Sequence, residues 1–310
     1  IRYITTAKKK GNFPCQQIRK IHRMSLSKFF SRQWNVHRER KKIMEKSANG
    51  EKMLPADYDK LDYEEIKDRL CITLHSKEQR IEQLKGNLSM DIEGTDLTAA
   101  IRIFTGKKDN ENGYFGIEPR YLETWGKTLE EVYQQALQNM PRLFPLRIME
   151  MDEMIGRLIF GLDDVEQDSE SLEIEFEPYK MYVLSNDTKT DGAAAILYPG
   201  LLEKLASNMQ SNIFILPSSE HETLLTKDTG EISARDWQSV VIQANQQLFS
   251  QDILSDEVYC YDYQEHMLKM VTDPEQTKEL RAQLQQMCCC VDATGANTQE
   301  YEEEDYGEEQ

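Results

Sequence analysis

Residues 191–226, DGAAAILYPGLLEKLASNMQSNIFILPSSEHETLLT, decide the fold because several independent patterns agree within them. Apolar residues recur from 194 to 209 at the three-to-four spacing of one helical face. Pro199 and Gly200 interrupt this face, and a proline inside a helix removes a backbone donor and collides with the preceding turn. The pattern therefore predicts a short first turn, a kink, and a main helix over about 200–209.

Two strands are predicted directly after this helix. The run at 212–216 is short, apolar and rich in β-formers, and Pro217 closes it because proline cannot continue a central ladder. The polar residues at 218–220 predict a turn, from which the chain returns as a second strand at 223–226.

The same alternation of elements extends over residues 181–263. A strand at 181–184 precedes the central helix, a second helix is predicted from Ser233, and a last strand covers 258–263. This order of strand, helix, strand, strand, helix, strand is the split βαβ pattern, which we expect to bury both helices on one face of a largely antiparallel sheet. The predicted fold class is α+β, with a mixed, largely antiparallel sheet and helices packed on it.

The upstream half contains a hairpin and a helix with a strong start signal. Strands at 97–104 and 114–117 are joined by a polar loop, and Thr128 with Glu131 forms a capping box at the start of the next helix. The residues expected to end that helix are Asn139, Pro141 and Pro145.

A second capping box, Ser233 with Asp236, repeats the first at an offset of 105 residues. The repeat indicates either two similar halves, 97–160 and 181–263, or a chance similarity.

Composition divides the chain into four parts. Residues 1–50 form a basic arm, flexible or helical, and 62–268 form the α+β domain. A helix is predicted at 274–290. The acidic tail at 291–310 has too few aliphatic residues to fold alone, so we expect it to be disordered.

The overall composition is that of a soluble protein. The chain has 310 residues, of which 39% are hydrophobic, and a mean hydropathy of −0.66. No apolar run approaches the roughly 20 residues of a bilayer helix, so we expect no membrane insertion and a cytoplasmic location. Since the sequence begins at Ile1, we interpret it as a fragment, a processed product, or an upstream-extended reading of a gene that starts near Met24.

Charge is distributed unevenly along the chain. The net charge is −18, but residues 1–50 hold 14 Lys and Arg against 2 Asp and Glu. The remaining 23 basic and 53 acidic residues give the rest of the chain a charge of −30, which would repel nucleic acid and anionic lipid.

Several strings resemble a bacterial family of uncharacterised proteins associated with mobile elements. Its members share a GAA-x-x-LYPG helix and an ILPSS-x-HE strand, turn and strand, which match GAAAILYPG at 192–200 and ILPSSEHE at 215–222. The resemblance covers roughly 67–263. Because the family is a domain of unknown function, the resemblance implies relatives but no reaction.

The strongest candidate for chemistry is the turn at 218–222. A serine activated by His221, with Ser219 as the nucleophile, or a metal held by His221 and Glu222, is conceivable. Neighbouring residues of an extended chain point to opposite faces, which argues against His221 and Glu222 binding one ion. The alternative is a structural turn in which Ser218 or Ser219 bonds nearby amides, while His221 bonds Tyr or carboxylate groups.

Other residues are weaker candidates for binding. Gly192 begins a helix that offers free amides to an anion. The full set of binding candidates is Ser218, Asn186, Gly192 and Tyr198. The histidines to which we assign no role are His22, His37, His75 and His266.

Common catalytic and metal motifs are absent from the sequence. It has no glycine-rich phosphate loop, zinc-binding His-Glu-x-x-His helix, paired Cys-x-x-Cys sets or nucleophile-elbow serine. We therefore predict no metal and no cofactor. The six cysteines are too scattered to suggest a disulfide framework, and we interpret the trio Cys288, Cys289 and Cys290 as free thiols rather than as a metal-binding or acylation site.

These observations favour a non-catalytic cytoplasmic interaction or regulatory module with an unknown protein partner. The first alternative is a hydrolase-like or metal-dependent enzyme centred on the turn at 218–222. The second is nucleic-acid binding through the basic arm, where aromatic residues lie beside Arg32, Arg38, Arg40, Lys41 and Lys42. The arm's competing role is to lie against the chain's own acidic body.

Overall fold

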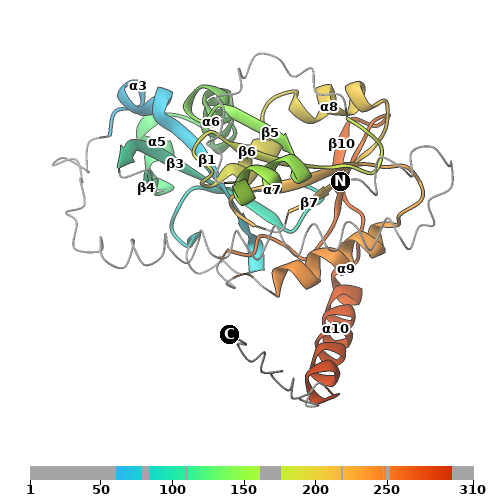
Figure 1. Ribbon diagram of the computed structural model, residues 1–310. Helices are drawn as coiled ribbons and strands as arrows, with labels where there is room; N and C mark the ends of the chain where they lie inside the picture. The colour runs from blue at the N-terminus through green and yellow to red at the C-terminus, as the bar shows by residue number, and fades with distance from the viewer. Residues whose placement is uncertain are drawn as a thin grey trace, which may run out of the picture. The chain divides into compact units, whose positions relative to one another are not determined.

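The computed structural model (Figure 1) describes residues 61–78, 84–108, 111–160, 176–217, 219–246, 248 and 252–294. The chain forms two units, one ending at Asp273 and one beginning at Pro274. Both sheets belong to the first unit, and the second contains the helix α10 (Pro274–Thr294). Helices together with antiparallel sheets confirm the predicted α+β class. The basic arm and the end of the acidic tail lie outside the described residues.

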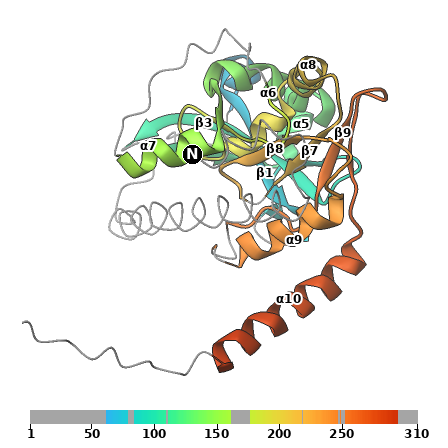
Figure 2. The same ribbon diagram turned by 45° about the vertical axis from the view of Figure 1, so that its right-hand side comes forward.

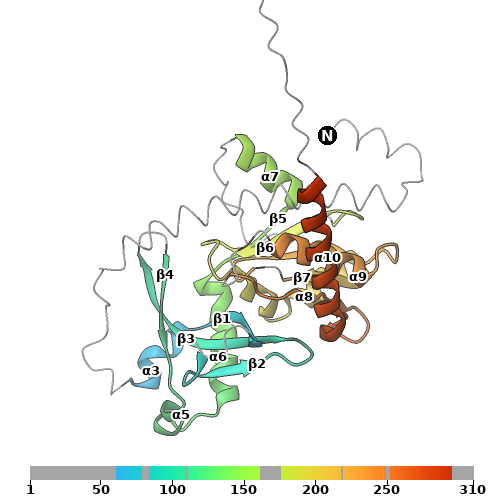
Figure 3. The same ribbon diagram turned by 90° about the horizontal axis from the view of Figure 1, so that it is seen from below.

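The smaller sheet is built around one long strand. β3 (Leu97–Lys108) pairs antiparallel with β1 (Leu70–Ser76) on one side. On the other side it pairs with β2 (Ser89–Asp91) and β4 (Glu111–Gly116). The β3–β4 hairpin was predicted, but both strands extend into the region expected to be a polar loop. Figure 3 shows this hairpin reaching beyond the part of β3 that pairs with β1 and β2.

The larger sheet has six strands, and each is antiparallel to its neighbours. Four of them were predicted, and the sequence patterns missed the two strands at the edges. The spatial order is β10 (Met267–Met270), β9 (Tyr259–Asp262), β7 (Ile213–Leu216), β8 (Thr223–Lys227), β6 (Met181–Asn186) and β5 (Leu146–Glu150).

Two helices make crossovers that each pass one strand, which is the predicted split βαβ order. α8 (Leu201–Met209) connects β6 to β7 around β8, and α9 (Ala234–Asn245) connects β8 to β9 around β7. The expectation that both helices share one face is wrong. α8 packs in a core cluster with Tyr182 and Ile215, whereas α9 packs with Val183 and Phe214. Successive residues of a strand point to opposite faces, so the helices cover opposite faces, as Figures 1 and 2 show.

The position of β9 explains this correction. β9 lies beside β7 rather than beside β6, so both crossovers advance in the same direction across the sheet. They start from β6 and β8, which are antiparallel. Crossovers of this kind are almost always right-handed, and two of the same hand that start on antiparallel strands and advance in one direction must use opposite faces. β5 occupies the place beside β6 where a returning strand would have put both helices on one face.

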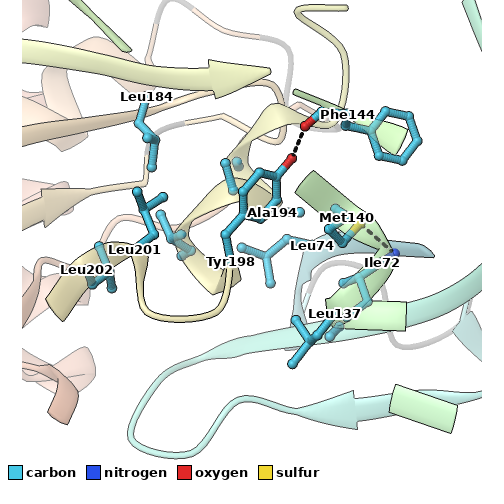
Figure 4. Packing of buried hydrophobic residues seen from close by; sticks show 14 of the residues in the cluster. Ile72, Leu74, Leu137, Met140, Phe144, Leu184, Ala194, Tyr198, Leu201 and Leu202 are labelled. Atoms are coloured by element: carbon cyan, nitrogen blue, oxygen red, sulfur yellow. Dashed lines mark hydrogen bonds between the residues drawn. The ribbon is translucent and has the colours of Figure 1, made fainter. Parts of the chain in front are cut away.

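The central stretch folds as its patterns predict. η3 (Gly192–Leu197) is the short first turn, and Pro199 follows at the interruption. Gly200 has a left-handed conformation with φ of 70° and caps α8. Because glycine has no Cβ, this position carries no steric penalty. The Tyr198 hydroxyl between the two segments donates to Phe144 O at 2.5 Å within the apolar core (Figure 4).

Both capping boxes form, at the starts of α6 (Leu129–Leu143) and α9. The predicted end of α6 is wrong, because Asn139 and Pro141 lie inside the helix. The Asn139 side chain donates to Lys67 O at 2.7 Å and to Leu70 O at 2.9 Å. α6 therefore lies along β1, the edge strand of the smaller sheet, and satisfies one of its backbone carbonyls.

The other short helices connect these layers. Asp62 caps the first of them by accepting the Glu64 amide at 2.8 Å. Their bounds are α3 (Tyr63–Ile66), η2 (Lys67–Arg69), α5 (Arg120–Trp125) and α7 (Met151–Phe160).

Candidate functional site

The turn between β7 and β8 is ordered by a serine hydroxyl. Ser219 Oγ accepts the amides of His221 at 3.2 Å and Glu222 at 3.3 Å, and the residue is buried. These are the bonds that the structural-turn alternative predicts for Ser218 or Ser219. Ser218 itself lies outside the described residues. The Ser219 hydroxyl is therefore used as a backbone acceptor in this turn.

His221 is held by backbone contacts from the neighbouring loop. Its Nδ1 accepts the Asp191 amide at 3.3 Å, and its carbonyl accepts Ser185 Oγ at 2.8 Å. An Nδ1 that accepts a hydrogen bond places the proton of the neutral ring on Nε2. The hydrogen bond to the Asp191 amide ties His221 to the start of η3, while the Ser219 hydroxyl bonds backbone amides.

The same turn provides Glu220, whose carboxylate belongs to a buried chain of hydrogen-bonded side chains that the sequence did not reveal. We call this chain the Thr73–His75–Glu220 relay. His75 Nδ1 lies 2.7 Å from Glu220 Oε1, and His75 Nε2 lies 2.8 Å from Thr73 Oγ1. Thr73, His75 and Glu220 are 2%, 6% and 8% exposed. This pair joins β1 of the smaller sheet to the turn between β7 and β8 of the larger sheet. We call this turn, residues 219–222, together with the adjoining residues 186–192, the corner. The sequence alone indicates no role for His75, because its partner Glu220 is 145 residues away.

Two of the binding candidates, Asn186 and Gly192, belong to this corner. Asn186 orders its own loop, since its Nδ2 donates to Thr190 O at 2.9 Å and its Oδ1 accepts Thr188 Oγ1 at 2.8 Å. Gly192 has no room for a side chain. An added Cβ would overlap Ser185 Oγ and would lie 2.5 Å from the His221 carbonyl.

Tyr198, the other binding candidate in the described structure, lies in the core. Its hydroxyl is committed to Phe144 O, and burial raises its pKa well above the usual range of tyrosine, with a smaller contribution from Asp187. This position favours a packing role for Tyr198.

Asp191 places a carboxylate between the corner and the smaller sheet. It has a left-handed backbone with φ of 53°, which is uncommon outside glycine. Burial, and then the Asp191 carboxylate, raise the pKa of both Tyr114 and Cys71. These two side chains therefore remain protonated at neutral pH.

A second polar contact joins the two sheets. Asp96 accepts hydrogen bonds from the Tyr259 hydroxyl and, at 2.8 Å, from Ser255 Oγ. Burial first, and then Asp96, raise the pKa of Tyr259 well above its usual value. Beside it, the buried Glu257 carboxylate accepts Gln238 Nε2 at 3.0 Å and Thr272 Oγ1 at 2.6 Å. We call the Thr73–His75–Glu220 and Asp96–Ser255–Tyr259 contacts together the polar seam.

The described residues place further limits on the site. Among them, no group of three or more His, Cys, Asp or Glu side chains is arranged to hold a metal ion. Within the same part of the chain, no helix combines the length and apolarity required to cross a membrane. The nucleic-acid candidates Arg32, Arg38, Arg40, Lys41 and Lys42 lie outside the described residues, as do the side chains of Cys288, Cys289 and Cys290.

Comparison with known proteins identifies one family. The family model described as "Family of unknown function (DUF5688)" matches residues 21–263, which includes the corner and both sheets up to β9. The match begins upstream of the resemblance, which covers roughly 67–263. No curated protein and no solved structure matches the chain.

Proposed function

This chain belongs to the DUF5688 family of unknown function, and we propose that it acts as a non-catalytic interaction or regulatory module. The proposal rests on one observation: the side chains at the corner that could react are engaged in internal hydrogen bonds. Ser219 orders the turn, Glu220 bonds His75 across the two sheets, and His221 accepts a backbone amide. Groups that are buried and committed to internal hydrogen bonds support architecture rather than turnover.

The proposed setting is the cytoplasm of bacteria, in the biology of mobile elements. Its support is the resemblance carried by residues 192–200 and 215–222. The partner is then a macromolecule recognised by the surface rather than a substrate enclosed by the corner.

Fluorophosphonate labelling of the full chain tests the absence of catalysis. The reagent reacts with activated serine or threonine hydroxyls, and tryptic mass spectrometry locates the adduct. We expect no labelling of Ser219, because its hydroxyl serves as an acceptor for two amides. Labelling that is lost in a folded His221→Ala variant, together with hydrolysis of p-nitrophenyl esters that is lost in the same variant, would overturn the proposal.

A hydrolase centred on the same corner is the second candidate. The observation in its favour is the Thr73–His75–Glu220 relay, which has the hydroxyl–imidazole–carboxylate order of a serine-hydrolase triad. All three side chains are buried, so a substrate would reach them only after a local opening of the structure. In the labelling experiment this candidate predicts an adduct on Thr73 or Ser219 that disappears in His75→Gln.

A further inference from the structure

The surface formed by α3 and α5 combines aromatic rings that face one another. Trp125 Nε1 donates to Leu61 O at 2.8 Å. The Trp125 ring centroid lies 5.6 Å from that of Tyr63 and 5.4 Å from that of Tyr121. Tyr121 is buried, whereas Tyr63 and Trp125 are half-buried and remain in part accessible. We call this the α3–α5 surface.

The α3–α5 surface is acidic and already accepts cations on its rings. With η2 and the start of α6 included, residues 61–69 and 118–131 carry eight acidic and four basic side chains, a net charge of −4. Lys127 Nζ lies 5.2 Å from the Tyr63 ring centroid, and Arg120 Cζ lies 5.3 Å from that of Tyr121. A cation over an aromatic face is attracted by the ring quadrupole. These cations are the protein's own, and Glu64 is itself paired with Lys67 at 2.5 Å. The excess of acidic side chains over basic ones is what suits the surface to a basic segment.

We propose that the α3–α5 surface binds the chain's own basic segment, residues 8–46. The occupant has the complementary charge, since residues 1–50 hold 14 basic against 2 acidic residues, and it includes Phe29, Phe30 and Trp34. It is also tethered beside the surface, because the chain enters the described structure at Leu61, the residue whose carbonyl accepts Trp125. The connection at 47–60 spans at most about 50 Å when extended.

The tether makes the contact intramolecular. A short connection raises the effective concentration of the second partner to the millimolar range, so individually weak exposed ion pairs are sufficient when several act together. The contact also withholds the basic segment from anionic partners outside the chain. It is therefore a regulatory contact, and it does not depend on whether the corner at Ser219 is catalytic.

Hydrogen–deuterium exchange of the full chain tests this proposal. Peptides from residues 8–46 are followed in the wild type and in Glu64→Lys with Glu65→Lys, at about 50 mM and about 500 mM NaCl, where the screening length falls from about 14 to about 4 Å. We expect exchange in the variant to be about three- to fivefold faster at low salt, in keeping with the loss of a few exposed ion pairs. High salt should abolish the difference.

Three further variants distinguish docking on this surface from misfolding of the variant and from an effect of the protein's net charge. Glu64→Gln with Glu65→Gln changes the charge without placing lysines at the start of α3, and it should give the same effect at smaller size. Glu203→Lys with Glu265→Lys alters two exposed acids elsewhere by the same charge and should leave exchange in 8–46 unchanged. Reversing Lys41 and Lys42 to Glu in the Glu64→Lys, Glu65→Lys background should restore slow exchange.

Several results would overturn the proposal. Equal exchange of 8–46 in the wild type and both Glu64/Glu65 variants would show that the segment does not use this surface. If the Glu203/Glu265 variant has an effect as large as that of the Glu64/Glu65 variant, the exchange rate depends on the net charge of the protein and not on binding to this surface. Protection that increases with protein concentration would assign the surface to the basic segment of a second copy.

Discussion

The two sheets are joined in two chemically different ways. Around η3 and α8 the junction is an apolar cluster that includes Leu205, Tyr198 and Leu74, and Figure 4 shows part of its packing. At the corner it is the polar seam, with His75 bonded to Glu220 and Asp96 bonded to Tyr259. Apolar burial is non-directional and depends on volume, whereas a buried hydrogen bond depends on both partners being present. The two junctions should therefore respond to mutation by different rules.

The largest expected effect is in the apolar cluster. Leu205→Ala removes a side chain that is fully buried between α8 and the larger sheet, and it should lower the free energy of unfolding by about 3 kcal/mol. Leu205→Met, which keeps the volume, should cost less than about 1.5 kcal/mol. Urea unfolding followed by circular dichroism measures both. Equal losses in the two variants would contradict a volume-dependent junction.

Gly192→Ala tests the point where the two junctions meet. The added Cβ collides with Ser185 Oγ and the His221 carbonyl, and overpacking of this kind costs about 1–3 kcal/mol. Gly156→Ala is the matched control, because its Cβ meets nothing within 4 Å in α7 and the change should be neutral or stabilising by up to about 1 kcal/mol. If both variants unfold at the same urea concentration, Ser185 and the His221 carbonyl can move to make room for the added Cβ at little cost.

The polar seam should show coupling between the two partners of a hydrogen bond. Glu220→Gln and His75→Gln each remove one partner of the buried 2.7 Å contact between these side chains, and each should cost about 1–3 kcal/mol. The double variant should cost less than the sum of the two by about 1 kcal/mol or more. A thermodynamic cycle from urea unfolding measures this coupling. Additive losses would mean that the two side chains contribute independently.

Helix caps provide a smaller effect outside both junctions. Ser233→Ala and Thr128→Ala each remove a capping box, and each should lower the free energy of unfolding by about 1 kcal/mol. Because the cap hydroxyls are exposed and bond within their own helix starts, whereas Leu205 is fully buried, their effects should add to that of Leu205→Ala within about 0.5 kcal/mol. Non-additive values would show that the caps are energetically coupled to the core.

Alkaline pH should weaken the fold through buried acids that remain protonated. Burial raises the pKa of Tyr133 from 10.0 to about 12 and that of Cys260 from 9.0 to about 11. Their stabilising contribution is complete below the unfolded values and is lost as pH rises from about 9 to about 12. Thermal unfolding across this range should show a falling midpoint, with a smaller fall in Tyr133→Phe. A pH-independent midpoint would contradict this account.

Local patterns predicted those elements that carry their own start and stop signals. The interruption at Pro199 and Gly200, the two capping boxes and the short strand closed by Pro217 all follow from steric or hydrogen-bonding properties of single residues. β1 was missed for a physical reason. All seven of its residues are buried, so LCITLHS lacks the alternation that marks a half-exposed strand.

The candidate site was predicted only in part. Gly192, Ser219 and His221 were singled out from the sequence, and the structure brings them together at one corner. The catalytic role proposed for Ser219, His221 and Glu222 stays a prediction, as does the binding role proposed for Gly192. His75 and Asp96 were missed because neither has a motif, and their partners lie on another sheet.

The amino-acid sequence by itself determined which segments around 181–263 are helix or strand, because proline, glycine, capping residues and apolar period act over a few positions. Only the tertiary structure decided that β9 lies beside β7, that α8 and α9 cover opposite faces, and that Glu220 meets His75. Strand order and buried pairing are set by which distant surfaces bury each other most completely, and no spacing within a single segment records that choice.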